Sequence, residues 1–187
     1  MSIETITKKL FTVDEYHRMF DAGILSPDHR FQLIRGEIIE MPVPKSQHSG
    51  RVNRLNRLFT SRLGESVIVS VQNPVWLDEL SEPVPDLVLL RPRADFYTDL
   101  SPSPEDVFLL VEISHTTVQY DTKIKAPLYA EAGIPEYWLL NINQDALEVR
   151  THPADGKYTS LTVFRRGQTI SPQKLPATTF SIDEILG

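Results

Sequence analysis

Three short apolar runs constrain the fold of this chain more than any other feature. They are rich in β-branched and long aliphatic residues, and they read "SVIVSVQNPVWL" (66–77), "PDLVLL" (85–90) and "VFLLVEI" (107–113). Runs of this length and composition are typical of β-strands that are covered on both faces. The sequence therefore predicts a central sheet that helices flank.

Helices are predicted before and after these runs, over 12–22, 46–63, 117–132 and 181–186. Thr12 and Glu15 form a capping-box pattern at the start of the first helix. Pro127 should kink the third helix or divide it in two, because proline lacks a backbone donor. Further strands are expected in a hairpin over 30–41, with a tight turn at Arg35-Gly36, and in a C-terminal β-hairpin region over 136–170. The prediction is a mixed α/β or α+β fold in a single domain, 1–187.

Composition narrows the classes of protein that fit. The 187 residues are 41% hydrophobic and contain no cysteine, which excludes disulfides and thiolate metal sites and suits a reducing cytoplasm. No run approaches the roughly 18 consecutive apolar residues of a membrane span, and the N-terminal segment lacks the pattern of a secretory signal. The net charge of −6 argues against a protein that coats nucleic acid through bulk charge. We therefore expect a cytoplasmic protein with no membrane contact.

Two carboxylates stand at the ends of neighbouring apolar runs, Asp86 at the start of one and Glu112 near the finish of the next. If these strands pair antiparallel, both carboxylates meet at one edge of the sheet. Like charges at that distance repel, and a hard divalent cation such as Mg²⁺ would offset them. The alternative is that Asp86 is a turn residue and Glu112 a surface residue at a strand end.

The predicted helix over 117–132 brings a lysine toward this pair. Asp121, Lys125 and Tyr129 recur every four residues and share one face of the helix, whereas Lys123 lies on nearly the opposite side. Two carboxylates, a metal ion and an ammonium group form a site that can cleave phosphodiester bonds. Lysines on helices are more often solvated, so the spacing alone does not establish such a role.

A longer pattern resembles a known family. The stretches "VPDLVLL", "LLVEIS" and "YDTKIKAPLYAEAGIPEYWLLN", together with "RFQLIRGEIIEMPVPKSQH" upstream, resemble the Uma2 family, also called DUF820, of restriction-endonuclease-like proteins. The resemblance covers residues 10–165. It implies the PD-(D/E)XK nuclease core, in which helices flank a mixed central β-sheet and a Mg²⁺ site, with Mn²⁺ as a substitute, lies at the sheet edge.

The resemblance also implies roles for single residues. Asp86 and Glu112 would be the metal ligands, and Lys125 would be the active lysine, with Lys123 as the fallback. The usual position of that lysine, two residues after the second acid, is Ser114 here. The family pattern E-L-(I/V)-D-G reads Gln32-Leu33-Ile34-Arg35-Gly36 in this chain, so Gln32 would fill a catalytic position with a neutral amide. A neutral amide is a poorer Mg²⁺ ligand than a carboxylate.

Basic residues are concentrated where a nucleic acid could bind. No acidic residue occurs from Met41 to Gly64, a stretch that contains Lys45, Arg51, Arg54, Arg57 and Arg62. We expect Lys45, Arg51, Arg54, Arg57 and Lys123 to contact phosphates, so that binding weakens as the salt concentration rises. The alternative is a solvated charged face.

The sequence therefore predicts a Mg²⁺-dependent endonuclease that hydrolyses phosphodiester bonds in DNA. Two rivals stay open: a catalytically weak or inactive nucleic-acid-binding or regulatory module on the same fold, and a structural protein that oligomerises. A homodimer is compatible with all three, because "EYWLLN" (136–141) and "LEVRT" (147–151) would offer an apolar hairpin.

Overall fold

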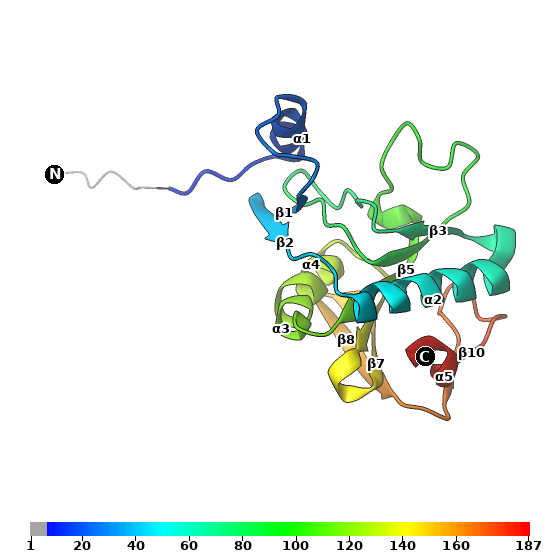
Figure 1. The fold of residues 1–187 in the computed structure, drawn as a ribbon. Helices are drawn as coiled ribbons and strands as arrows, with labels where there is room; N and C mark the ends of the chain where they lie inside the picture. The colour runs from blue at the N-terminus through cyan, green and yellow to red at the C-terminus, as the bar shows by residue number, and fades with distance from the viewer. Residues whose placement is uncertain (1–6) are drawn as a thin grey trace.

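A computed structural model describes residues 7–187 (Figure 1). Residues 1–6 lie outside the described residues. They begin the N-terminal segment in which the sequence predicts no secretory signal. The main sheet has six strands in the order β3-β4-β5-β6-β7-β8, and all neighbours are antiparallel except the parallel pair β5 and β6. Its strands are β3 (Ile68–Val71), β4 (Leu87–Leu90), β5 (Val107–Ser114), β6 (Glu136–Asn141), β7 (Ala146–Ala154) and β8 (Lys157–Phe164).

The remaining elements surround this sheet. Two smaller sheets pair β1 with β2 and β9 with β10. The other elements are α1 (Val13–Asp21), β1 (Arg30–Ile34), β2 (Glu37–Met41), α2 (Ser46–Leu63), η1 (Gly64–Ser66), η2 (Pro104–Asp106), α3 (Val118–Tyr120), η3 (Asp121–Lys125), α4 (Ala126–Glu131), η4 (Ile142–Gln144), β9 (Thr169–Ile170), β10 (Phe180–Ser181) and α5 (Ile182–Leu186). No helix within residues 7–187 is both long and apolar enough to cross a membrane.

The central strands are covered on both faces, as their composition predicts. Leu87 and Leu89 of β4 pack into one core with Leu55 and Phe59 of α2. Their neighbours on β4 face the other core, which includes Tyr129 of α4. Side chains of a strand alternate between faces, so each face of β4 and β5 packs against a different helix.

The pairing of β4 with β5 is regular at one end and irregular at the other. Leu87 lies opposite Val111, and the register shifts by one residue between Leu89 and Leu90. This bulge lies beside the connecting segment 91–106. The pairing is therefore regular at the Leu87 end, where the sequence predicts both acidic residues.

The N-terminal elements form a small unit of their own. Thr12 and Glu15 make the predicted capping box at the start of α1. The β1–β2 hairpin turns at Arg35 and Gly36, whose φ angles of 51° and 76° both lie in the left-handed region. A Cβ on Gly36 would lie 2.6 Å from the Cβ of Leu10, so both the conformation and the space require glycine.

The prediction of a strand over 66–77 is mostly wrong, because only Ile68–Val71 is a strand. The strand ends at Gln72, whose φ of 52° turns the chain out of the extended conformation. Asn73 and Pro74 follow, and neither favours continuation of a strand. The chain then runs without regular structure to Asp86.

The predicted helix over 117–132 is divided into segments, as Pro127 led us to expect. α3 continues into η3, a π-helical turn in which the Ala126 amide donates to the Asp121 carbonyl. Pro127 stands in the first turn of α4, where its missing donor costs least. The wide π turn places Asp121 and Lys125 both in the interior and leaves Lys123 exposed.

The predicted C-terminal strands are present, but their surface differs from our expectation. β6 lies inside the main sheet and all six of its residues are buried. The apolar hairpin that we expected to offer a dimer contact is therefore not accessible at β6. The accessible strand of this region is β8, which forms one edge of the sheet. The short helix predicted at the C-terminal end is α5, and Ser181 caps it.

Candidate functional site

Asp86 and Glu112 meet at the end of the β4–β5 pair where the register is regular. Leu87 lies opposite Val111, so the residue before Leu87 reaches the residue after Val111. Asp86 is 6% exposed and Glu112 is 4% exposed. The predicted antiparallel pairing is therefore present, and it brings the two carboxylates together at the adjacent ends of the interior strands β4 and β5.

Three donors hold the carboxylate of Asp86. Its Oδ2 accepts hydrogen bonds of 2.9 Å from Nε2 of His48 and 2.9 Å from the backbone amide of Ile113. Its Oδ1 accepts a bond of 3.2 Å from Nε2 of Gln72. Burial acts to raise the pKa of Asp86, but the hydrogen bonds from His48 and the Ile113 amide, together with the positive charges of His48 and Lys125, hold the pKa below its usual value. Asp86 is therefore ionised at neutral pH.

His48 is fixed by the same contact. It enters from the first turn of α2, and Nε2 must carry the proton because an ionised carboxylate only accepts. The hydrogen bond to Asp86 raises the pKa of His48 above its ordinary value. Its Nδ1 is buried and has no hydrogen-bond partner within the described part of the chain.

Only one carboxylate oxygen of Glu112 accepts hydrogen bonds from residues 7–187. Its Oε1 accepts a hydrogen bond of 2.8 Å from Nζ of Lys125 and one of 2.7 Å from the hydroxyl of Tyr129. No residue from 7 to 187 donates to its Oε2. Burial raises the pKa of Glu112 to about 7, although the Lys125 charge opposes this rise. For Lys125, burial acts to lower the pKa, but the charges of Glu112 and Asp121 outweigh it and keep the pKa above its usual value.

A second network of hydrogen bonds reaches the site from the segment between β5 and the π turn. Asp121 is 3% exposed and accepts a hydrogen bond of 2.7 Å from the hydroxyl of Thr117. That hydroxyl lies 3.2 Å from the hydroxyl of Ser114, the residue at the usual lysine position of the motif. Asp121 thus adds a third buried carboxyl group near Glu112 and Lys125.

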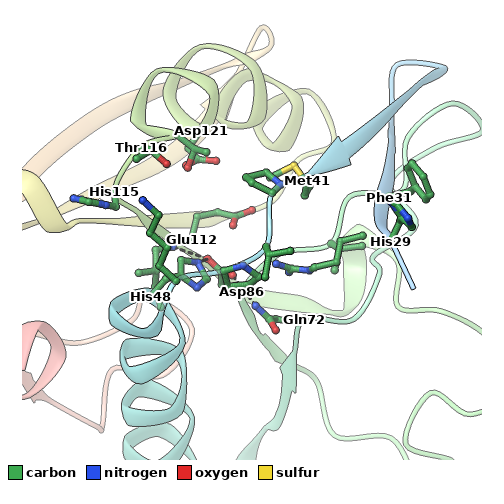
Figure 2. Close-up of a pocket in the computed structure, with 18 of the residues that line it drawn as sticks. His29, Phe31, Met41, His48, Gln72, Asp86, Glu112, His115, Thr116 and Asp121 are labelled. Atoms are coloured by element: carbon green, nitrogen blue, oxygen red, sulfur yellow. Dashed lines mark hydrogen bonds and ion pairs between the residues drawn. The ribbon is translucent and has the colours of Figure 1, made fainter. Parts of the chain in front are cut away.

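These residues line a cavity of about 700 Å³ (Figure 2). Asp86, Glu112, Asp121, Lys125 and His48 form one end of it. The opposite end holds His29 and Phe31 from the β1 region, and Met41 lies between the two ends in the view of Figure 2. The buried acids are therefore reachable from solvent through a space large enough for a ligand.

Gln32, the remaining predicted catalytic residue, lies near the site but does not line the cavity. Gln32 is fully buried and accepts a hydrogen bond of 3.3 Å from the amide of Val84 through Oε1, while its Nε2 has no partner among the described residues. It does not line the cavity but contacts the chain two residues before Asp86. The departure from a carboxylate at this position therefore lies beside the site rather than in the cavity wall.

The predicted cationic residues fall into three groups. Lys45 is exposed and lines the cavity. Arg57 and Lys123 are exposed elsewhere, and Arg51 is half-buried on α2, where it donates to the carbonyl of Gln47. Arg54 is exposed but lies against Gly187 at the end of the described chain, where a Cβ on that glycine would lie 2.7 Å from its Nε.

Three residues of the site were not among the predicted catalytic positions. The sequence places Asp121 on the helix face of Lys125 without indicating a catalytic role, and it indicates none for His48. It predicts Gln72 inside a strand. The spacing of Asp121 and Lys125 was a usable signal, whereas the contacts of His48 and Gln72 with Asp86 depend on tertiary structure.

The donor atoms determine which metal could bind. Residues 7–187 contain no cluster of three or more histidine, aspartate and glutamate side chains that could hold a metal ion. A carboxylate has about four lone-pair positions. Asp86 uses three of them and Glu112 two, so both keep free oxygen acceptors facing the cavity. Two carboxylates suit a hard cation that takes its other ligands from water and a substrate phosphate.

Comparisons with known proteins identify the family and the fold of the chain. The model of the Uma2 family, described as "Putative restriction endonuclease", matches residues 13–183. A solved structure described as "a putative nuclease belonging to DUF820", from Anabaena variabilis, is similar with a TM-score of 0.73 and 15% sequence identity. The match covers 94% of this chain and 97% of that one. No curated protein matches the chain. At this identity the structural likeness shows the fold, and it confirms the predicted nuclease-like α+β class.

Proposed function

The chain belongs to the Uma2 family, and on that premise we propose that it is a Mg²⁺-dependent endonuclease that hydrolyses phosphodiester bonds in DNA. One observation carries the proposal. Asp86 and Glu112 lie together at the ends of two adjacent strands and line a cavity, and Nζ of Lys125 lies 2.8 Å from Oε1 of Glu112. A structural role for this group would not require access from a cavity of this size.

Asp86 and Glu112 would hold the metal through their free carboxylate oxygens, and Mn²⁺ would substitute for Mg²⁺. When bound, the cation would polarise the phosphate and lower the pKa of a bound water. Because the protein supplies few ligands, affinity for the free ion should be modest and should increase when a substrate phosphate is present.

The chain's own residues have separate tasks in this proposal. Hydrolysis adds a water oxygen to phosphorus and expels one ester oxygen, while negative charge grows on the phosphate. The Lys125 ammonium lies where it can stabilise that charge, and Tyr129 fixes the Glu112 oxygen that the ammonium also contacts. His48 and the Ile113 amide hold Asp86 in its ionised form and fixed orientation.

Gln32 would fill a weakened position next to the metal ligands. Its Oε1 accepts a hydrogen bond from the Val84 amide, and its buried Nε2 has no partner within residues 7–187. A carboxylate there would add negative charge beside Asp86, and its absence would reduce metal affinity rather than abolish catalysis. This departure is the reason to test the alternative of a module that binds nucleic acid without cleaving it.

The DNA would follow the basic residues that lead away from the cavity. Lys45 lines the cavity, and Arg51, Arg54 and Arg57 continue along α2, while Lys123 lies on the η3 side. Each phosphate contact should add to the salt dependence of binding. A cytoplasmic location and a homodimer remain predictions.

The test is a cleavage assay on single-stranded and double-stranded DNA with Mg²⁺, Mn²⁺ or EDTA. We expect cleavage by the wild type with either metal, none with EDTA, and none in Asp86→Ala or Glu112→Ala. Glu65→Ala is the matched control, because Glu65 is an exposed acid outside the cavity. Calorimetric titration of Mg²⁺ into the same variants separates loss of metal from loss of chemistry. DNA binding without cleavage, unaffected by Asp86→Ala, would favour the non-catalytic module.

A further inference from the structure

The end of the cavity opposite the acids has a different chemistry. His29 and Phe31 stack there with ring planes 13° apart and centroids 5.9 Å apart. Met41, Pro42 and Val43 continue the same wall from the end of β2. Figure 2 shows the His29–Phe31 pair far from Asp121 and His115, on the other side of Met41. This aromatic wall, defined as His29, Phe31, Met41, Pro42 and Val43, is not used by the proposed metal site.

Much of the aromatic wall is more exposed than its apolar character would predict. Val43 is 85% exposed, and the side chain of His29 is 54% exposed. Phe31 is only half-buried, with its edge against Phe20. Apolar surface that faces a cavity beside a reactive site commonly binds a ligand. His29 is held there by Glu40, whose Oε1 lies 2.6 Å from its Nδ1, and Phe31 packs against the small core that α1 and β1 share.

Two cationic residues line the same cavity. Arg30 and Lys45 both contribute to its wall, and no ion pair joins either of them to an acidic residue within residues 7–187. By contrast, Lys125 is paired with Glu112. A ligand that carries a flat apolar group and several phosphates would match the aromatic wall, the two unpaired cations and the acidic end together.

We propose that the aromatic wall is a subsite for an unpaired nucleobase, so that the substrate is a single-stranded segment or a frayed end rather than an intact duplex. The proposal rests on the proposed nuclease function, whose reactive phosphate would lie at the acidic end. In a duplex the base faces are stacked on each other and cannot contact an aromatic wall. In a single strand the face of a base is free, and a neighbouring phosphate would contact Arg30 or Lys45.

The test measures binding without cleavage. Fluorescence anisotropy in Ca²⁺ would compare a labelled single-stranded oligonucleotide, the same strand with abasic sites, and a blunt hairpin duplex. We expect the wild type to bind the ordinary strand at least about fivefold more tightly than the abasic strand or the duplex, because base stacking on aromatic residues is sequence-tolerant but requires the base.

Single substitutions test whether the aromatic wall causes the preference for the ordinary strand. His29→Ala should lose about fivefold or more in affinity for the ordinary strand, with no change for the abasic strand, and His29→Phe should keep the affinity because it keeps a ring. Phe31→Ala should behave like His29→Ala, with thermal unfolding as a check on its folding. Phe96→Ala is the matched control, since Phe96 is 73% exposed and lies outside the cavity.

The outcomes separate this inference from the proposed function. Equal affinity of the wild type for ordinary and abasic strands would overturn the inference, even if cleavage is observed. Base-dependent binding that His29→Ala removes would support the inference, even if no cleavage is found and the nuclease proposal fails. Loss of affinity for the abasic strand in His29→Ala would also overturn it, since the ring would then act on the backbone and not on a base.

Discussion

Nζ of Lys125 lies 2.8 Å from Oε1 of Glu112, and the two side chains are 2% and 5% exposed. The ion pair is therefore enclosed by protein, and each charge depends on the other. Removing one partner leaves an uncompensated charge in the interior, whereas removing both leaves none.

We predict that Lys125→Met lowers the free energy of unfolding at pH 8 by about 3–5 kcal/mol. Burial already raises the pKa of Glu112 to about 7, and without the opposing Lys125 charge the buried group must either stay ionised without a counter-charge or take up a proton. The double variant Glu112→Gln, Lys125→Met should recover most of that loss. Urea unfolding of both variants measures the effect. Lys123→Met is the control, and it should change the free energy by less than about 0.5 kcal/mol because Lys123 is exposed. A double variant no more stable than Lys125→Met would contradict the prediction.

His48→Ala should reduce cleavage by about 10- to 100-fold, because it removes a hydrogen bond that fixes Asp86. Metal binding should persist, since Asp86 and Glu112 keep their oxygens. His48→Asn should restore part of the activity if its amide reaches Asp86. The measurement is single-turnover cleavage at saturating Mg²⁺, with calorimetry on the same samples. Unchanged cleavage in His48→Ala would show that the contact has no part in the reaction.

Gln32→Glu should increase the affinity for Mg²⁺ and make folding more dependent on it. A buried carboxylate replaces an amide beside Asp86, so the variant should be less stable than the wild type in EDTA by about 1–3 kcal/mol. Added Mg²⁺ should raise its melting temperature by more than it raises that of the wild type. Thermal unfolding across a Mg²⁺ series checks this. Equal metal-induced shifts in the two proteins would place Gln32 out of reach of the metal.

Glu136 should make stability depend on pH in a way that is separate from the site. Burial raises its pKa above the usual value, although Gln173 and Trp138 donate hydrogen bonds to it. The folded state therefore holds the proton more tightly than the unfolded state. The resulting stability is fully present below the usual glutamate pKa and is lost as the pH rises through the raised pKa.

The variant Glu136→Gln lacks this titration. Its stability relative to the wild type should improve as the pH rises from 4 to 8, on top of a constant cost from the altered hydrogen bonds. Urea unfolding at both pH values gives the two differences. The exposed control Glu105→Gln should show no such trend, and a flat difference for Glu136→Gln would refute the prediction.

Arg57→Ala should weaken DNA binding and reduce the slope of log affinity against log salt by about 0.7–0.9, the amount expected for one lost phosphate contact. Arg57 is exposed, so folding should be unaffected. Arg54→Ala is an informative comparison, because Arg54 lies against Gly187 and its loss should also affect the packing of α2 near the C-terminus. Filter binding over a range of NaCl concentrations would measure both slopes. An unchanged slope in Arg57→Ala would mean that Arg57 contacts no phosphate and belongs to a solvated charged face of α2.

Much of this arrangement could be predicted from local patterns. The apolar runs predicted strands enclosed on both faces, and the antiparallel pairing of two of them was enough to bring Asp86 and Glu112 together. Helical spacing correctly separated Lys125, which is buried, from Lys123, which is exposed. These features depend on neighbours within one element or on one pairing.

Features that depend on distant contacts could not be predicted in the same way. Gln72 belongs by composition to a strand, but it follows the last residue of β3 and donates to Asp86, which lies opposite it at the end of β4. His48 reaches Asp86 from another helix, and nothing in its sequence neighbours indicates that contact. The apolar strand β6 was expected at a surface, yet pairing on both sides encloses it. In each case the outcome was decided by which elements pack together.

The bulge between Leu89 and Leu90 has a practical consequence for the segment 91–106. An irregular pairing can accept an added residue by a local change of twist, while the regular pairing at Leu87 and Val111 keeps its register. Changes of length in this segment should therefore leave the spacing of the two acids unaltered. The turn near Phe96, which is exposed and far along the chain from both acids, is accordingly a suitable place to insert a tag or attach a fluorophore.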